Sequence, residues 1–223
     1  MTGHRPDSTR GPESTERIDR NDERSRKRRE SILDAAFHVF ARAGYRDAAV
    51  DEIAERSETS KGGVYFHFPT KQRLFVELMR ATADRLVERV EREAAGVRDP
   101  VVKADVALRT VLAVFAGHRT MAKLLVVDAV GAGRDFQAEL EKLHIRFAGL
   151  IQGYLDEAVA SGAIAPIDTA VTSQAWFGAL NEIVTRWLIA DRPERLEDAY
   201  PTLRTILLGG VGIDADRLGE AVR

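Results

Sequence analysis

The 223-residue chain contains no cysteine, which excludes a disulfide framework and a thiolate metal site. It also has no apolar run long enough to cross a bilayer and no signal-peptide pattern. These absences predict a cytoplasmic protein that has no membrane partner.

The chain also lacks the fingerprints of common catalytic sites. It contains no Gly-x-Ser-x-Gly nucleophile motif, no phosphate-binding loop and no dinucleotide-binding pattern. A metal site on one helix needs a spacing such as i, i+4, but neither His118 nor His144 has a His, Asp or Glu four residues away. We therefore expect neither an enzyme nor a metal or cofactor site.

Apolar periodicity predicts an all-α fold of about nine helices. Strand-like alternation is absent, and apolar residues recur at spacings of three and four. Gly44 and Gly162 suit helix ends, Asp99-Pro100 suits a helix start, and Pro201 should kink or split the last segment. The expected helices cover residues 24–43, two short stretches within 49–71, and residues 71–95, 100–116, 120–129, 134–160, 168–190 and 191–209.

The distribution of charge divides the chain more clearly than its net charge of −2 does. Residues 24–75 carry 11 Lys/Arg against 7 Asp/Glu, a net charge of +4, whereas residues 76–223 carry 18 against 22, a net charge of −4. A basic N-terminal module attached to an acidic body is typical of a DNA-binding protein. Residues 1–23 are polar and nearly free of apolar side chains, which predicts a disordered arm.

A helix-turn-helix is indicated by residues 49–71. Val50, Ile53 and Ala54 are the apolar positions of a first short helix, and Val64 and Phe68 are those of a second. With the apolar stripe of residues 32–40, these positions predict a small three-helix core. Helices this short are stable only when they pack against neighbours.

The second short helix has start and stop signals that leave one face in water. Ser60 suits the N-cap, and Pro69 disfavours helical dihedrals at Phe68, so the helix should end there. The remaining face carries small, basic and aromatic residues, which suit base edges and phosphates in a DNA major groove. These residues are Lys61, Gly62, Gly63, Tyr65, Phe66 and His67.

The stretch S-K-G-G-V-Y-F-H-F-P-T-K-Q-R-L-F, which starts at Ser60, is similar to the helix-turn-helix segment of TetR-family transcriptional regulators. This resemblance covers residues 25–75 and implies a phosphate contact by Lys71. The basic run at residues 24–29 adds phosphate or minor-groove contacts as one interpretation and a solvated helix start as the other. The candidate DNA contacts are therefore Arg26, Arg28, Val50, Ser60, Lys61, Gly62, Gly63, Tyr65, Phe66, His67 and Lys71.

The turn of the helix-turn-helix departs from the family pattern. The family has a glycine in the middle of this turn, where this chain has Glu58 between Ser57 and Thr59. The position normally adopts a left-handed conformation, which costs a residue with a Cβ about 1–2 kcal/mol. Glu58 therefore either tolerates this strain or gives the turn a geometry of its own.

The family resemblance also implies the organisation of the rest of the chain. We expect a DNA-binding domain at residues 24–72, followed by a ligand-binding and dimerisation domain at residues 73–223. The last two long helices should form a four-helix interface with a second copy, because half-sites about 34–36 Å apart require a two-fold dimer. The expected interface residues are Trp187, Leu203, Ile206 and Leu207.

An effector pocket is expected among the C-terminal helices, where family members hold their ligands. Aliphatic and aromatic residues dominate the candidates, which favours a small hydrophobic effector over a charged one. The candidate pocket residues are Phe115, Met121, Leu125, Phe147, Gln174, Trp176, Phe177 and Asn181.

The function indicated by the sequence is that of a homodimeric repressor, released from a palindromic double-stranded operator by such an effector. Two alternatives stay open at this point. One is a DNA-binding regulator that does not respond to a small molecule, and the other is an activator.

Overall fold

The computed structural model describes residues 12–128 and 136–213. Within these ranges the structure has nine α-helices, one π-helical turn and one 3₁₀ turn, with no strand, so the prediction of an all-α fold is confirmed. The α-helices are α1 (Pro12–Asp47), α2 (Val50–Arg56), α3 (Lys61–His67), α4 (Lys71–Ala94), α5 (Pro100–Gly117), α6 (Arg119–Lys123), α8 (Gln137–Ala160), α9 (Thr169–Ala190) and α10 (Tyr200–Gly210), and the turns are η1 (Leu124–Asp128) and η3 (Leu196–Ala199).

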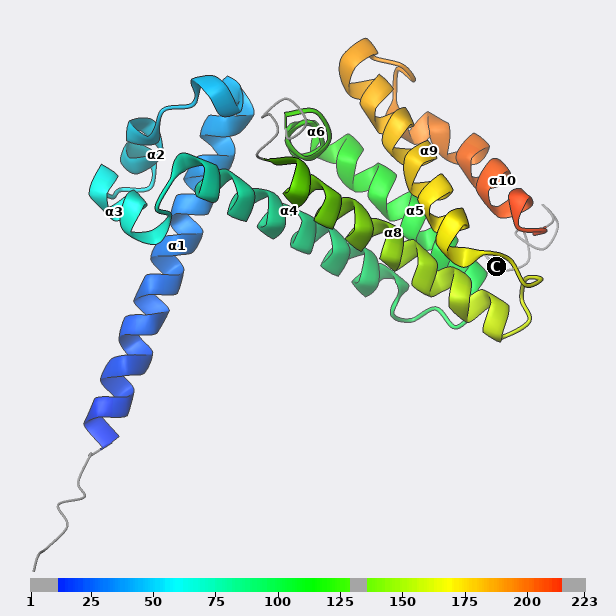
Figure 1. Ribbon diagram of the computed structural model, residues 1–223, viewed down its shortest axis with the longest axis horizontal. Helices are drawn as coiled ribbons and strands as arrows, with labels where there is room; N and C mark the ends of the chain where they lie inside the picture. The colour runs from blue at the N-terminus through cyan, green and yellow to red at the C-terminus, as the bar shows by residue number, and fades with distance from the viewer. Residues whose placement is uncertain (1–11, 129–135, 214–223) are drawn as a thin grey trace, which may run out of the picture.

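Helix α1 starts earlier than the sequence predicts. A disordered arm is expected over residues 1–23, but residues 12–23 are helical and project away from the body, and residues 1–11 lie outside the described residues (Figure 1). A proline suits the first helical turn, no glycine follows before Gly44, and Lys27 pairs with Glu23 at 2.7 Å. The low hydrophobicity of residues 12–23 therefore indicates a solvent-exposed helix rather than a disordered arm. At its other end, Gly44 breaks the helical dihedrals with φ 73° and ψ 172°, where a helix end is expected.

The first three helices share the small core that the apolar spacing predicts. Ile32 and Phe40 of α1, Ile53 of α2, Val64 of α3 and Phe68 are each at most 1% exposed. Because α2 and α3 have only seven residues each, this burial fixes their mutual orientation.

Helix α4 connects this small domain to the C-terminal body. Its 24 residues span about 36 Å at 1.5 Å per residue. Phe75 in its first turns packs edge-on against Phe40, with ring centroids 4.9 Å apart, and Phe136 ahead of α8 contacts both Phe75 and Tyr45 at 5.5 and 4.7 Å. The apolar core is therefore continuous from one domain into the other.

The C-terminal body is a bundle in which α8 and α9 pack along one another beside α5 and α10 (Figure 1). A buried carboxylate joins α5 to α10: Asp105 accepts hydrogen bonds from the Tyr200 hydroxyl at 2.7 Å and from Arg204 Nε at 3.0 Å. The last segment is split as Pro201 predicts, because η3 ends at Ala199 and α10 starts with the proline in its first turn. Among the described residues, no single helix has the length and hydropathy to cross a bilayer.

The turn between α2 and α3 keeps the left-handed geometry expected at Glu58, where φ is 52°. The Thr59 N–H donates to the Ala54 carbonyl at 2.9 Å, and the Glu58 N–H donates to the Glu55 carbonyl at 3.1 Å. These two bonds form a Schellman motif, in which glycine usually occupies the position of Glu58. Arg28 of α1 donates to the carbonyls of residues 57 and 58, both at 3.2 Å, and so ties the turn to the first helix.

We expect Glu58→Gly to stabilise the DNA-binding domain by about 1 kcal/mol relative to Glu58→Ala, because only glycine adopts the positive φ without strain. Both substitutions remove the charge, so their difference isolates the backbone contribution. Denaturant unfolding of the two variants measures it, and a glycine variant less stable than the alanine variant would contradict the strain at this turn.

Candidate DNA-binding interface and effector cavity

The exposed face of α3 carries the residues expected to face DNA. The N-cap is formed as predicted, since Ser60 Oγ accepts a hydrogen bond from the Gly63 N–H at 3.0 Å. Val64 is buried, whereas Phe66 is 82% and Tyr65 39% exposed. Such large exposed aromatic side chains on a helix otherwise anchored by its buried face favour a binding surface.

The two glycines of α3 differ in what surrounds them. A Cβ on Gly63 would lie 2.5 Å from Thr59 Oγ1, so a side chain there would force the Thr59 hydroxyl to move. A Cβ on Gly62 would meet only Ser60 Oγ at 3.8 Å, so space alone does not require a glycine there. The open side of Gly62 leaves the helix backbone accessible to a groove.

Lys61 begins the exposed face as a cation. Its Nζ lies 2.9 Å from Asp51 Oδ2 of α2. This hydrogen bond, together with the charge of Asp51, holds the pKa of Lys61 above its ordinary value. The ammonium group therefore stays charged on the surface where the sequence predicts DNA.

Lys71 and Arg28, both candidate phosphate contacts, also hold the fold together. Lys71 Nζ donates to the Arg46 carbonyl at 2.9 Å and lies 5.2 Å from the centre of the Tyr45 ring, and burial lowers its pKa. Arg28 binds the turn carbonyls as described above. The sequence gives no signal for these two roles, because both partners are backbone carbonyls that lie far away along the chain.

Two further candidates differ in their surroundings. Arg26 is exposed on α1, as a phosphate contact requires. Its Nε lies 4.0 Å from Glu30 Oε1. Val50 is only 7% exposed and packs in the domain core with Ile53 and Ala54. The apolar spacing of α2 accounts for this burial, and a DNA contact by Val50 stays a prediction.

A cavity of about 110 Å³ lies inside the C-terminal body. Helices α4, α5, α8 and α9 supply most of its wall, with two residues from η1 and one from α10. Among the described residues that line it there is no Lys, Arg, Asp or Glu, and the polar side chains are His144, Tyr154, Trp176 and Asn181. Burial is the main reason that the pKa of Tyr154 lies above its ordinary value, so its hydroxyl stays protonated. The cavity therefore suits an apolar chain with few hydrogen bonds.

Most of the predicted pocket residues come together in this wall. The structure places Phe115, Leu125, Phe147, Trp176, Phe177 and Asn181 there. Gln174 is exposed, and Met121 packs against the core, but neither of these two predicted residues lines the cavity. Sequence reasoning missed Leu86 and Val90, which belong to the apolar stripe of α4 and reveal no cavity until α4 is packed.

The residues expected at a dimer interface mostly face inward. Trp187, Leu203 and Leu207 are 5–7% exposed within one protomer, and Leu207 lines the cavity. Arg119 covers the Trp187 ring at 4.5 Å, so this tryptophan completes the core of its own chain. Of the four candidates only Ile206, 61% exposed, is available to a partner. The apolar stripe of α9 is wide because this helix packs against α8, η1 and α6 of its own chain. Sequence periodicity does not distinguish such contacts from contacts with a second copy.

Comparison with protein families decides the assignment. A family model described as bacterial regulatory proteins of the tetR family matches residues 32–78, and one described as the C-terminal region of YsiA-like protein matches residues 79–210. The chain belongs to the TetR family. It is a DNA-binding transcriptional regulator with a helix-turn-helix, and not an enzyme.

Relatives of this TetR-family protein extend the likeness over both domains. The fatty acid metabolism regulator protein of Bacillus subtilis is 23% identical over 81% of this chain and 93% of its own length. The structure of FadR from Bacillus subtilis in complex with stearoyl-CoA has a TM-score of 0.74 and 22% identity, covering 82% of this chain and 98% of that one. FadR from Bacillus halodurans matches with a TM-score of 0.74 and 23% identity over 83% and 99%. At these identities the two structures establish the fold alone.

We expect Lys61→Ala to weaken both specific and non-specific DNA binding and to reduce the slope of log affinity against log salt by about 1 per bound protomer. The reason is the loss of one cation from the face of α3. Binding isotherms at several salt concentrations measure the slope. Lys103→Ala, which removes a cation paired with Glu157 in the C-terminal body, is the matched control and should leave the slope unchanged. An equal slope of log affinity against log salt in both variants would mean that Lys61 of α3 does not contact a DNA phosphate.

Proposed function

We propose that the protein is a homodimeric repressor that leaves a palindromic operator when a long-chain acyl effector fills the cavity of its C-terminal body. The observation that supports this most directly is the apolar cavity itself. Its lining is mostly apolar and has only a few hydrogen-bonding groups, so it can bury an acyl chain.

The position of α4 supports a coupling between the cavity and DNA. Leu86 and Val90 in its second half line the cavity, whereas Leu74 and Phe75 in its first turn belong to the core of the DNA-binding domain. A ligand that displaces one half of a rigid helix displaces the other. Such a ligand lowers DNA affinity by as much as it prefers the displaced state.

The chemical class of the effector is inferred from the cavity and from the relatives together. Stearoyl-CoA is bound by FadR from Bacillus subtilis, whose fold this chain shares. The described lining of the present cavity carries no cation, so we assign the acyl chain to the cavity and the phosphates of a CoA thioester to its exterior. A regulator of this kind acts in the cytoplasm, where its operator lies.

A dimer surface is supported by exposed apolar residues on α8 and α9. Ile145 is 63%, Val171 62% and Ile189 68% exposed. On the same two helices, a Cβ added at Gly149, Gly153 or Gly178 would meet no atom within 4 Å. Apolar side chains next to open glycines allow the helices of a second copy to approach closely.

We expect Ala107→Phe to give a repressor that binds DNA but no longer responds to the effector. Ala107 lines the cavity from α5, so a benzyl group there occupies the space of the acyl chain. The operator is first selected from genomic fragments bound by the protein. Its affinity is then measured by fluorescence anisotropy with and without stearoyl-CoA, and CoA alone serves as the ligand control.

Ala113→Phe is the matched protein control, because Ala113 lies on the exposed side of the same helix. Wild type and Ala113→Phe should lose operator affinity in stearoyl-CoA, by about 5- to 150-fold, the usual range of allosteric coupling. Unchanged operator affinity of the wild type would contradict an acyl-CoA effector. An unaltered response of a folded Ala107→Phe variant would contradict the cavity as its site.

We expect Ile189→Arg to convert the dimer into a monomer, because it places a charge within an apolar interface. Sedimentation velocity measures the mass, and thermal unfolding shows that the protomer is intact. Ile206→Arg, an equally exposed isoleucine on α10, should remain dimeric. A monomer from Ile206→Arg and a dimer from Ile189→Arg would move the interface to α10.

A further inference from the structure

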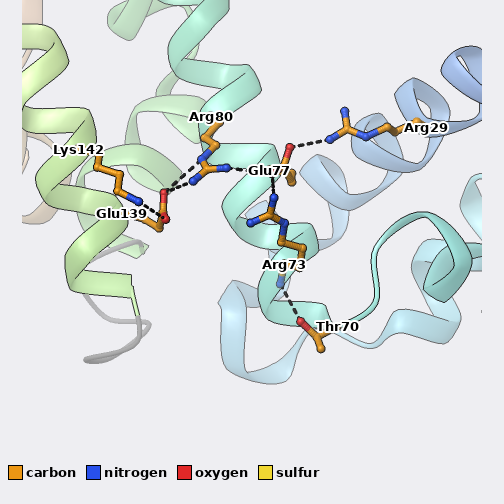
Figure 2. A network of polar contacts seen from close by, with 7 residues as sticks. All are labelled: Arg29, Thr70, Arg73, Glu77, Arg80, Glu139 and Lys142. Carbon is orange, nitrogen blue, oxygen red and sulfur yellow. Dashed lines mark hydrogen bonds and ion pairs between the residues drawn. The ribbon is translucent and has the colours of Figure 1, made fainter.

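A row of charged side chains crosses the structure from α8 through α4 to α1 (Figure 2). Arg80 of α4 donates to Glu139 Oε2 of α8 through Nη2 at 2.5 Å and through Nε at 3.2 Å. Its Nη1 donates to Glu77 Oε1 at 3.1 Å. The second oxygen of Glu77 accepts from Arg29 Nη2 of α1 at 2.6 Å. We call Glu139, Arg80, Glu77 and Arg29 the charge ladder.

The ladder starts beside the effector cavity. Glu139 lies in the first turn of α8, and the next residue, Leu140, lines the cavity together with Leu143 one turn later. Any ligand-driven displacement of this turn therefore moves the Glu139 carboxylate with it. A displacement of about 1 Å lengthens both of its hydrogen bonds to Arg80 beyond good geometry.

The ladder ends at the recognition helix. The Arg29 guanidinium lies 5.0 Å from the centre of the Phe68 ring. Phe68 is the C-cap of α3, is 1% exposed, and donates its backbone N–H to the Val64 carbonyl at 2.8 Å. Arg29 therefore touches α4 through its charge and the end of α3 through its planar face.

Both carboxylates of the ladder are largely shielded from water. The side chains of Glu77 and Glu139 are 18% and 20% exposed, so each depends on its cations more than a surface carboxylate does. Hydrogen bonds from Lys142 and Arg80 hold the pKa of Glu139 below its ordinary value.

Each carboxylate has one partner on another helix and at least one within its own, since Glu77 pairs with both Arg73 and Arg80 of α4. Arg73 pairs with Glu77 within α4 at 3.0 Å, and Lys142 pairs with Glu139 within α8 at 2.9 Å. Only the pairs of Glu139 with Arg80 and of Glu77 with Arg29 cross between helices. The intrahelical pairs therefore provide controls of equal charge that leave the crossing unaltered.

We propose that Glu139, Arg80, Glu77 and Arg29 act as positioning residues that transmit the state of the cavity to Phe68 and the recognition helix. This inference rests on the proposed function, since it supplies the path by which an effector would reach the DNA-binding surface. The aromatic contacts of Phe136 with Tyr45 and Phe75 keep the domains packed when a ladder residue is replaced.

One experiment tests the ladder without any effector. Hydrogen–deuterium exchange is followed in a peptide that covers residues 60–68 of the full-length protein. Glu139→Gln should speed its exchange by about threefold, through local opening of α3. Lys142→Gln, which removes the intrahelical partner of the same carboxylate, should leave it unchanged. Equal exchange in wild type and both variants overturns the proposal, whatever the effector proves to be.

A second experiment uses stearoyl-CoA as the probe and measures the ratio of operator affinities without and with it. Glu139→Gln and Arg29→Gln should each reduce this ratio about fivefold, and the double variant should lose no more than either single one, because both residues lie on one path. Affinity for stearoyl-CoA, measured by calorimetry without DNA, should not fall in Glu139→Gln, because the ligand no longer has to break the pair with Arg80. Additive losses, or a ratio as large as that of wild type in both single variants, overturn the ladder.

The two experiments separate failure of the ladder from failure of the proposed function. If stearoyl-CoA leaves wild-type DNA binding unchanged, the acyl-CoA effector is wrong, and the exchange experiment alone decides the ladder. If stearoyl-CoA releases the wild type and all ladder variants equally, the proposed function holds and the ladder is wrong.

Discussion

Burial of α4 against two different groups of helices is the constraint on which the other features depend. Its first turns complete the core of α1, α2 and α3, and its second half forms a wall of the cavity in the C-terminal body. A helix of 24 residues is too stiff to bend between these sites without losing hydrogen bonds, and Phe136 wedges against Phe75 where the two cores meet. A displacement of α4 at the cavity would therefore also displace its first turns in the DNA-binding domain.

The helix-turn-helix depends on contacts that come from outside its own two helices. Seven-residue helices have little stability in isolation, so the geometry of α3 is set by its neighbours. Arg28 holds the carbonyls of a turn that contains Glu58 at positive φ, and Lys71 holds the last turn of α1. These cations serve the fold and also lie next to the expected path of DNA, which explains why sequence alone assigned them only to DNA.

The sequence predicted those features that depend on neighbours along the chain. The helices, the Ser60 cap and the end of α3 before Pro69 follow from local chemistry, whereas the positive φ at Glu58 was expected from the family pattern, which has a glycine there. Features that depend on tertiary packing were missed or misassigned. Trp187 looks like an interface residue until Arg119 is placed over its ring, and the helical arm at residues 12–23 depends on the continuation of α1 into a part that packs in the core.

Apolar and charged contacts contribute differently where the two domains meet. The rings of Phe136, Tyr45 and Phe75 attract one another over a range of positions, so they hold the domains together while allowing small shifts. A guanidinium–carboxylate pair loses its hydrogen bonds within a fraction of that shift, because its geometry is directional. Where the two domains meet, the aromatic contacts can therefore persist while the Arg80–Glu139 pair opens. In the proposed mechanism, the charged pair is the contact that responds to a small displacement, and the aromatic cluster is the contact that keeps the domains together.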